Sequence, residues 1–293
     1  MIIDCHAHYE PRILDAESII KVMDEAGIQK TALIPHLTDP PETQKGDFVM
    51  AVQRLMFNSN TLRSLGIFIT KSMYKKSGEW NLWLNKLKKE PQKFKIVQKP
   101  DNDRVAKMVS QFPDRFWGWI FINPLMPEAL DELDRLKNIP GMIGVKIHPF
   151  WHRFPMEKVE AVARRTEELG LPLLVHLGFD ASGNYQWLIK MFPRLKIIFA
   201  HLGVPFYKSL WPEVKHNPNI FLDISSTYHV DEALVRRAVK EIGAHKCLFG
   251  TDSPYAHVDA VEQIKNWVNN LSVIDAEKEQ IFSKNFLELI NWL

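Results

Sequence analysis

Met1-Ile2-Ile3-Asp4-Cys5-His6-Ala7-His8 opens the chain, and in it three apolar residues run into an aspartate and two histidines. Successive side chains of a β-strand point to opposite faces, so residues two positions apart share a face. As a strand, this stretch would place Asp4, His6 and His8 on one face and Cys5 on the other. Two imidazoles on one face can bind one metal ion, whereas a pair of surface histidines would carry no function. The rest of the chain decides between these readings.

The composition is that of an ordinary soluble globular protein. Of the 293 residues, 46% are hydrophobic and 25% are charged, with a formal net charge of +2, which argues against nucleic acid as a partner. Cys5 and Cys247 give no disulfide framework. We find no signal peptide, and no apolar run approaches the roughly 18 residues of a membrane helix. We therefore expect a cytoplasmic protein that acts on a small molecule, without nucleic-acid or membrane partners.

Strand and helix patterns alternate along most of the chain. Short apolar runs predict eight strands, at residues 1–8, 31–36, 116–122, 143–148, 172–176, 196–201, 220–225 and 247–251. Helical spacing follows them at residues 13–27, 127–137, 157–169, 184–192, 207–214, 231–242, 258–270 and 276–293. Eight alternating units favour an α/β fold of the closed (β/α)8 TIM-barrel type, as one domain over residues 1–293. An open doubly wound sheet is the alternative, but the turn Glu10-Pro11-Arg12 lacks its phosphate-binding glycines.

A long insertion interrupts this alternation after the second strand, at about residues 37–114. Helices are predicted within it at residues 45–57 and 79–87. The lysine-dense stretch at residues 86–99 is typical of a solvated helix face. A large excursion at this place can cover a site as a lid or build an oligomer contact.

Polar residues stand at the ends of the predicted strands, where barrel enzymes build their active sites. His176 and His201 are 25 positions apart, about one repeat, and His201 and Asp252 are 51 apart, about two repeats. Each therefore lies at the same level of a different strand. Imidazole nitrogen and carboxylate oxygen are the usual ligands of a catalytic divalent ion. Zinc fits this set well, with manganese or iron as alternatives. The other strand-end residues are His36, Lys146, His148 and Asp223.

The ordered set of motifs resembles the amidohydrolase superfamily, in its amidohydrolase 2 or aminocarboxymuconate-semialdehyde-decarboxylase-like branch. The motifs are Asp4-Cys5-His6-Ala7-His8, Gly144-Val-Lys-Ile-His-Pro149, Leu173-Leu-Val-His-Leu-Gly178, Phe199-Ala-His-Leu-Gly203 and Leu248-Phe-Gly-Thr-Asp-Ser-Pro254. They run in family order over essentially the whole chain, and the insertion is the least matched stretch. The resemblance implies a metal-dependent TIM-barrel hydrolase and, together with the insertion, suggests a homodimer.

The resemblance also implies roles for individual residues. His6, His8 and His176 would bind one divalent metal ion, with Asp252 as a further ligand or hydrogen-bonded to its water. His201 would be the acid/base residue beside that water, so His201 and Asp252 would be the catalytic pair. A metal held in this way lowers the pKa of its bound water from ~15.7 toward ~7. A nearby carboxylate or imidazole can then take up and return the proton.

Two further residues leave alternatives open. In some branches of the superfamily a lysine at the place of Lys146 is carboxylated and bridges two metal ions, but one ion is usual in the branch resembled here. Lys146 and His148 would then face an anionic substrate group such as a carboxylate. Pairing of Lys146 with Asp223 across the barrel is the alternative. Asp4 would orient a ligand histidine or make only a strand-end hydrogen bond.

We therefore expect a metal-dependent hydrolase in which metal-activated water attacks the carbonyl of an ester, lactone or amide. The substrate would be small and carboxylate-bearing. The first alternative is metal-dependent, non-oxidative decarboxylation of an aromatic or unsaturated carboxylic acid, which uses the same residues. The second is a non-catalytic metal- or ligand-binding barrel. Loop residues such as Trp151, His229 and Tyr255 would ring the mouth and suit a planar, acidic ligand.

Overall fold

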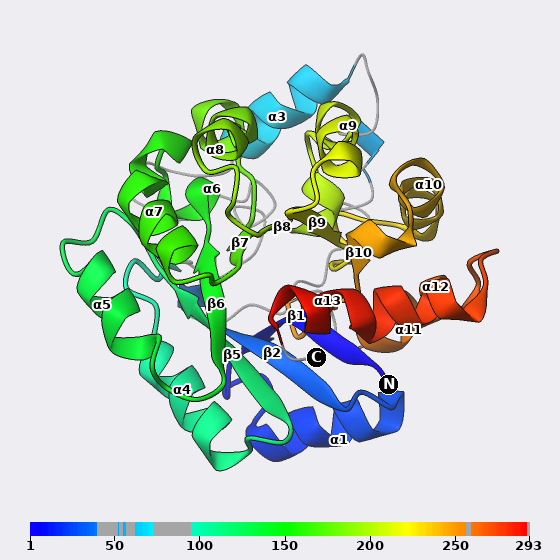
Figure 1. Cartoon of the computed structure of the whole chain (residues 1–293), viewed down its shortest axis with the longest axis horizontal. Coiled ribbons are helices and arrows are strands. Elements are labelled where there is room, and N and C mark those ends of the chain that lie inside the picture. The colour runs from blue at the N-terminus through cyan, green and yellow to red at the C-terminus, as the bar shows by residue number, and fades with distance from the viewer. Residues whose placement is uncertain (40–51, 53–54, 57–61, 73–94, 256–258, 292–293) are drawn as a thin grey trace, which may run out of the picture.

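Eight parallel strands form the central sheet of the protein (Figure 1). The computed structural model describes residues 1–39, 52, 55, 56, 62–72, 95–255 and 259–291. Each predicted strand is present, with its ends shifted by a few residues. In sheet order the strands are β1 (Ile3–Tyr9), β2 (Lys30–Pro35), β5 (Phe116–Phe121), β6 (Met142–Ile147), β7 (Leu173–Val175), β8 (Ile197–Phe199), β9 (Ile220–Asp223) and β10 (Cys247–Leu248).

Backbone hydrogen bonds join the end of this sheet back to its beginning. The N–H of Cys5 in β1 donates to the carbonyl oxygen of Phe249, just after β10, over 2.9 Å. The N–H of His8 donates to the carbonyl oxygen of Ser253 over 2.7 Å. Because the other edge of β1 pairs with β2, these bonds close the sheet into a barrel. The predicted (β/α)8 TIM barrel is confirmed.

Alternate residues of the strands face either the barrel interior or the surrounding helices. In β7, Leu174 packs in the interior with Trp117 and Trp119, whereas Leu173 and Val175 pack toward the helices. Both layers are apolar because a parallel strand in a barrel is buried on both faces. The barrel is therefore a packed core, and polar residues in it are exceptions that need an explanation.

A C-terminal helical segment closes the end of the barrel at which the strands begin. The sequence predicts one helix over residues 276–293, but the structure has α12 (Asp275–Glu279), a π-helical turn at Gln280–Lys284 and α13 (Asn285–Leu289). The Phe286 ring in α13 lies 6.1 Å from the ring of Trp117 in the interior. The π-helical turn offers the carbonyl of Ile281 to the N–H of Phe249 over 2.9 Å. Polar residues of the interior therefore gather at the opposite end.

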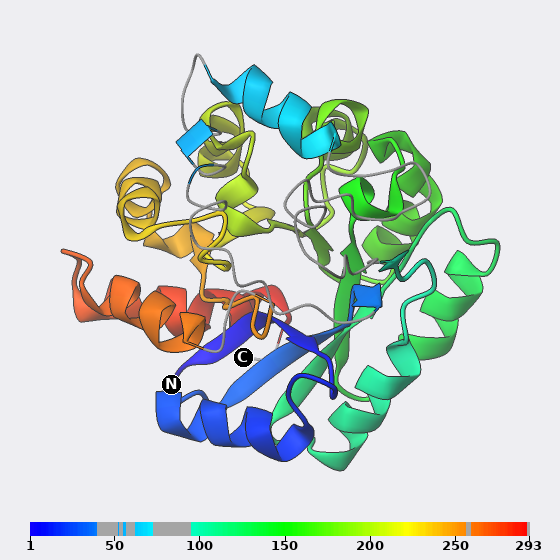
Figure 2. The same cartoon turned by 180° about the vertical axis from the view of Figure 1, so that it is seen from behind.

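Helices surround the sheet in both views (Figures 1 and 2). The helices are α1 (Ala16–Ala26), α4 (Asn102–Gln111), α5 (Ala129–Leu136), α6 (Pro149–His152), α7 (Glu160–Glu168), α8 (Tyr185–Met191), α9 (Tyr207–His216), α10 (Glu232–Ile242) and α11 (Ala260–Asn269). Each of these coincides with a predicted helix except α4 and the short α6.

Parts of residues 37–114, where an insertion is predicted, are among the described residues. β3 (Thr38–Asp39) pairs antiparallel with β4 (Lys95–Ile96), and α3 (Arg63–Ser72) lies between them in the sequence. α4 packs on β5 and β2 as a barrel helix, so regular barrel structure resumes at Asn102. The helix predicted at residues 79–87 lies outside the described residues, as does most of that predicted at 45–57.

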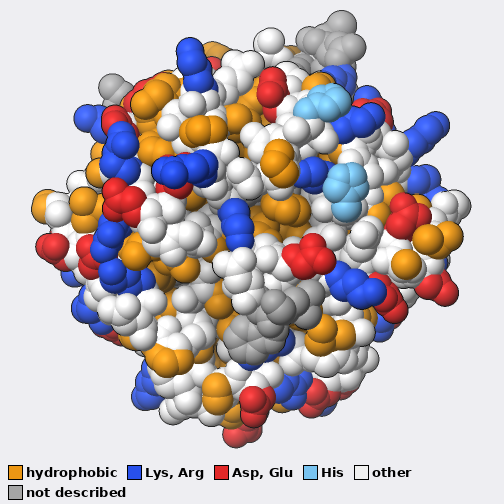
Figure 3. Space-filling model, in the orientation of Figure 1, with side chains coloured by type: hydrophobic (Ala, Val, Ile, Leu, Met, Phe, Trp, Pro, Cys, Tyr) orange, Lys and Arg blue, Asp and Glu red, His pale blue; other side chains and the backbone are white. Residues whose placement is uncertain are grey.

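The described surface mixes both signs of charge. Lysine and arginine side chains are interspersed with aspartate and glutamate over the face drawn in Figure 3. Among the described helices, none combines the length and the apolar character needed to cross a bilayer.

Asn102 ties α4 to the barrel. Its side-chain oxygen accepts from the N–H of Phe121 over 2.8 Å, and its side-chain nitrogen donates to the Phe121 carbonyl over 3.1 Å. Asn102→Ala removes both partners in a buried place, so we expect the free energy of unfolding to fall by about 2 kcal/mol. Urea denaturation measures this. Asn266→Ala on the exposed side of α11 is the matched control and should stay within about 0.5 kcal/mol of the parent. Equal losses in the two variants would contradict the role of Asn102.

Candidate metal centre

A bulge in β1 decides which of its side chains enter the barrel. The register between β1 and β2 shifts between Asp4 and Ala7. Cys5 consequently packs in the interior core, whereas Asp4 lines a small cavity facing α1, beside Met23. The prediction that Asp4 shares a face with His6 and His8 is therefore wrong, and so is the prediction that Cys5 points away from the interior. A bulge adds one residue to a strand and reverses its alternation.

Asp4 makes the strand-end hydrogen bonds of the simpler alternative. Its carboxylate accepts from the N–H of His6 over 3.0 Å, and from the N–H and hydroxyl of Thr251 over 3.1 and 2.6 Å. Burial raises the pKa of Asp4 to about 7. The carboxylate thus fastens β1 to the segment after β10, and its bonds go to backbone and hydroxyl groups.

His6, His8 and Asp252 converge at the end of the barrel where the strands end. The Oδ1 atom of Asp252 lies 3.2 Å from Nε2 of His8 and 3.5 Å from Nε2 of His6. Ligand atoms of all three lie within 4.8 Å of one another. Ligands about 2.0–2.2 Å from one tetrahedral ion are separated by distances close to these. The chemistry and spacing of this donor trio therefore fit a divalent metal ion.

Each histidine of the trio is held through its other ring nitrogen. Nδ1 of His8 contacts the carbonyl oxygen of Pro35 over 3.3 Å, and Nδ1 of His6 contacts Oδ2 of Asp223 over 2.9 Å. Metal-binding histidines in proteins are commonly oriented in this way. Burial opposes ionisation of Asp252, but its hydrogen bond with His8 holds its pKa well below the ordinary value. Asp252 therefore offers an ionised carboxylate.

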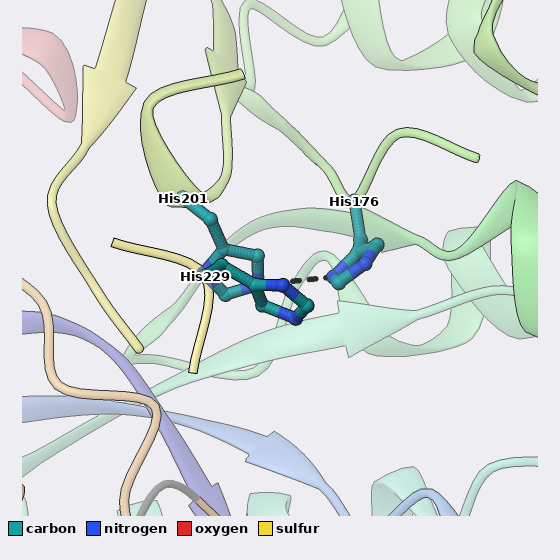
Figure 4. A group of neighbouring side chains, drawn as sticks. All are labelled: His176, His201 and His229. Atoms are coloured by element: carbon teal, nitrogen blue, oxygen red, sulfur yellow. Dashed lines mark hydrogen bonds between the residues drawn. The ribbon is translucent and has the colours of Figure 1, made fainter. Parts of the chain in front are cut away.

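His176, His201 and His229 form a second group beside the trio (Figure 4). Nδ1 of His176 lies 3.0 Å from Nε2 of His201. The rings of His201 and His6 stack with centroids 5.2 Å apart, so the two groups adjoin. Burial lowers the pKa of His201 to about 3 and that of His176 well below its ordinary value. Both rings are therefore neutral, which is the form that binds metals and accepts protons.

The structure thus divides the predicted ligand set. It brings His6, His8 and Asp252 together, whereas the predicted ligand His176 lies against the predicted acid/base residue His201. His201 and Asp252 also share positive φ angles, 55° and 61°. Non-glycine residues rarely adopt this conformation, and it concentrates at functional sites.

Lys146 and His148 face the interior on β6 and just after it, as predicted. Burial lowers the pKa of the Lys146 ammonium to about 8, opposed by the charges of Asp223 and Asp252. Within the described part of the chain Lys146 forms no ion pair, because Asp223 pairs with His6 instead. The alternative of a Lys146–Asp223 pair is therefore wrong. The ring of His148 stacks on that of His176, with centroids 4.0 Å apart.

Asp223 and Ser225 are site residues whose roles the sequence did not reveal. Both are fully buried at the end of β9, and they contact His6 and His201. Burial opposes ionisation of Asp223, yet the neighbouring His6 and His201 hold its pKa well below the ordinary value. Their spacing of two positions at a strand end, the same as that of His6 and His8, was the available signal.

Aromatic rings border the donor groups. Tyr255 meets the ring of His8 edge-on, with centroids 4.9 Å apart, and Trp151 lies 5.1 Å from His148. The sequence placed both residues on loops around the mouth without a role, whereas the structure has Trp151 in α6. Together with the histidines they give the site flat, apolar surfaces that suit a planar ring.

Comparisons with known proteins agree with this architecture. The protein-family model described as amidohydrolase matches residues 89–290. A gamma-resorcylate decarboxylase from Polaromonas sp. strain JS666 is 23% identical over 239 residues, which cover 61% of this chain and 72% of the relative.

Two solved structures share the fold over nearly the whole chain. One is a 2,6-dihydroxybenzoate decarboxylase complexed with 2,6-dihydroxybenzoate, with a TM-score of 0.62, 18% identity and 99% coverage of both chains. The other is a 5-carboxyvanillate decarboxylase from Novosphingobium aromaticivorans, complexed with manganese and 4-hydroxy-3-methoxy-5-nitrobenzoic acid. It has a TM-score of 0.63, 14% identity and coverage of 99% of this chain and 96% of that one.

The donor trio predicts how much metal the purified protein retains. After loading with zinc, manganese or iron and desalting, the parent should hold about one ion per chain, and His8→Gln less than about 0.2. Elemental analysis measures both. His152→Gln is the matched control, because His152 is buried outside the trio with Nε2 against the Val97 carbonyl. A parent below about 0.2 ions would contradict the site, and about two ions with an altered mass of Lys146 would support the carboxylated-lysine alternative.

Proposed function

The chain belongs to the amidohydrolase family, and we propose that it is a metal-dependent, non-oxidative decarboxylase of an aromatic carboxylic acid. The observation that carries the proposal is the placement of the donor trio beside flat aromatic surfaces and a buried ammonium group. Such a site suits a planar anion. Decarboxylation is favoured over hydrolysis because the relatives that the chain resembles act on dihydroxybenzoate and carboxyvanillate. The predicted hydrolysis of an ester, lactone or amide stays a prediction.

The proposed metal ligands are His6, His8 and Asp252, with His176 as the fourth. Zinc and manganese both suit a set of imidazoles and one carboxylate, and the solved 5-carboxyvanillate decarboxylase contains manganese. When bound, a divalent ion attracts the oxygen atoms of an anionic substrate and lowers the energy of charge that develops on them. The protein holds the ligand rings from behind, as the contacts of His6 with Asp223 and of His8 with Pro35 illustrate.

Lys146 and His148 are proposed to bind the substrate. The Lys146 ammonium is 1% exposed and lies in the interior among the charges of Asp223 and Asp252. A buried cation is stabilised by an anion that takes the place of water. A substrate carboxylate or phenolate supplies that anion. His148 offers a neutral ring, because burial lowers its pKa well below the ordinary value, and it can stack on the substrate's own ring.

The reaction consumes one proton for each carbon dioxide released. The bond between the ring carbon and the carboxylate carbon breaks, its electron pair stays on the ring carbon, and a proton joins that carbon. We assign the handling of this proton to His201 and Asp252. Burial lowers the pKa of His201 to about 3, and the charge of Asp252 is the strongest influence that opposes this. The charge of Asp252 therefore favours a proton held on His201, which suits a residue that takes up and returns a proton.

A panel of acids and esters tests the reaction type. We expect carbon dioxide release from hydroxylated benzoic acids by the metal-loaded protein, with one arene formed for each carbon dioxide. Lactones and esters in the same panel should yield no additional carboxylate. Hydrolysis without carbon dioxide release would restore the hydrolase prediction. Absence of turnover across the whole panel would favour a non-catalytic barrel.

His201→Asn tests the assignment of the proton-handling residue. The variant should lose at least about 100-fold in kcat, since general acid–base catalysis contributes that much or more. Its metal content should stay at the parent's level. Loss of the metal together with activity would make His201 a ligand instead, and retention of activity would remove it from the mechanism.

A further inference from the structure

The carboxylate of Asp223 lies against groups that can donate hydrogen bonds to it, and two of these, backbone N–H groups, can only donate. Its Oδ2 atom lies 2.9 Å from Nδ1 of His6. Its Oδ1 atom receives the backbone N–H groups of His201 and Ser225 over 2.9 and 3.1 Å, and a short bond from the Ser225 hydroxyl. Every partner must therefore donate. It follows that Nδ1 of His6 carries the ring proton and that Nε2, the atom facing Asp252, is free to bind a metal.

The Ser225 hydroxyl passes this constraint on to His201. A hydroxyl has one proton and two lone pairs, and the proton of Ser225 is given to Asp223. Its oxygen also lies 2.9 Å from Nδ1 of His201. Only a lone pair remains for that contact, so Nδ1 of His201 must carry a proton and donate it. The carbonyl oxygen of Ser225, 3.2 Å from the same nitrogen, agrees with this direction.

The constraint extends one ring further. With its proton on Nδ1, His201 has its other ring nitrogen, Nε2, available as an acceptor, and this atom lies 3.0 Å from Nδ1 of His176. His176 must then donate from Nδ1 and is left with a bare Nε2 of its own. One carboxylate and one hydroxyl thereby set the positions of the ring protons on three imidazoles.

We propose that Ser225 is a positioning residue, which relays the charge of Asp223 to His201 and so fixes the ring protons of His201 and His176 on Nδ1. This rests on the proposed function only in giving His201 its task of handling a proton. The bare Nε2 of His201 is the atom that accepts a proton, and the bare Nε2 of His176 is the form that can bind a metal. Ser225 touches neither substrate nor metal in this assignment; its Oγ acts through His201 and also lies 3.2 Å from Nδ1 of His6.

Nitrogen NMR of the protein with labelled histidine tests the relay without any turnover. In the metal-free parent the ring protons of His201 and His176 should lie on Nδ1. Variants that each replace one histidine assign the signals. Ser225→Ala leaves the weaker carbonyl contact as the acceptor, so both rings should become mixtures of the two tautomers. Ser226→Ala is the matched control. Its hydroxyl is buried at the next position, and among the described residues it has no hydrogen-bond partner.

Kinetics of the metal-loaded protein give a second readout. With metal in excess, Ser225→Ala should lower kcat about 10-fold at unchanged KM, whereas Ser226→Ala should match the parent. A ring proton on Nε2 of His201 in the parent would overturn the proposal. So would identical spectra for the two alanine variants. Failure of the parent to decarboxylate any acid would refute the proposed function but would leave the spectral result decisive for the relay.

Asp223→Asn separates the two arms of the network. The amide oxygen should keep the backbone N–H groups and the Ser225 hydroxyl, while the amide nitrogen faces Nδ1 of His6. We expect the proton of His6 to move to Nε2, with about 10-fold or greater loss of metal affinity. The tautomer of His201 should stay as in the parent. A change confined to His201 would contradict the assigned directions.

Discussion

The buried carboxylate of Asp223 is the constraint on which the site depends. An ionised group with no exposed surface is stable in a barrel interior only if donors surround it. These come from separate parts of the chain, from the ring of His6 in β1, from the backbone of His201 after β8, and from Ser225 after β9. Because one small anion requires all of them, their relative positions are fixed before any ligand arrives. The candidate metal site and the proton-handling histidine of this amidohydrolase-family enzyme are therefore one connected unit.

This arrangement also explains how so many imidazoles can lie side by side. Charged histidines would repel one another, but burial lowers the pKa values of His8, His148, His176 and His201. Neutral rings can stack, and each can donate from one nitrogen while the other stays bare. The cluster thus holds unprotonated ring nitrogens in fixed positions away from water. This preorganised environment favours both metal binding and proton transfer.

Much of the fold was predictable because alternation and apolar runs report burial directly. The strand-end rule likewise placed His6, His8 and Asp252 in one region. The alternation of side chains along a strand predicted the wrong faces for Asp4 and Cys5. Alternation assumes an unbroken strand, and the sequence carries no sign of the β1 bulge. The sequence likewise did not show that a π-helical turn divides the predicted C-terminal helix, because the turn leaves the apolar face of the helix almost unchanged. Which group donates in the hydrogen bonds of Asp223 and Ser225 follows from which groups lie in contact, and the spacing of residues in the sequence does not show these contacts.

The donor trio straddles the seam of the barrel, where β1 meets the segment after β10. Two of its groups come from the first strand and one from the segment after the last strand, so the site exists only while these parts are joined. An ion bound there acts as a staple between parts of the chain that are almost 250 positions apart. Since the open chain offers no such site, the ion's binding free energy adds to the stability of the closed barrel. Metal binding and closure of the barrel are thus coupled, so catalytic activity and the stability of the fold are gained or lost together.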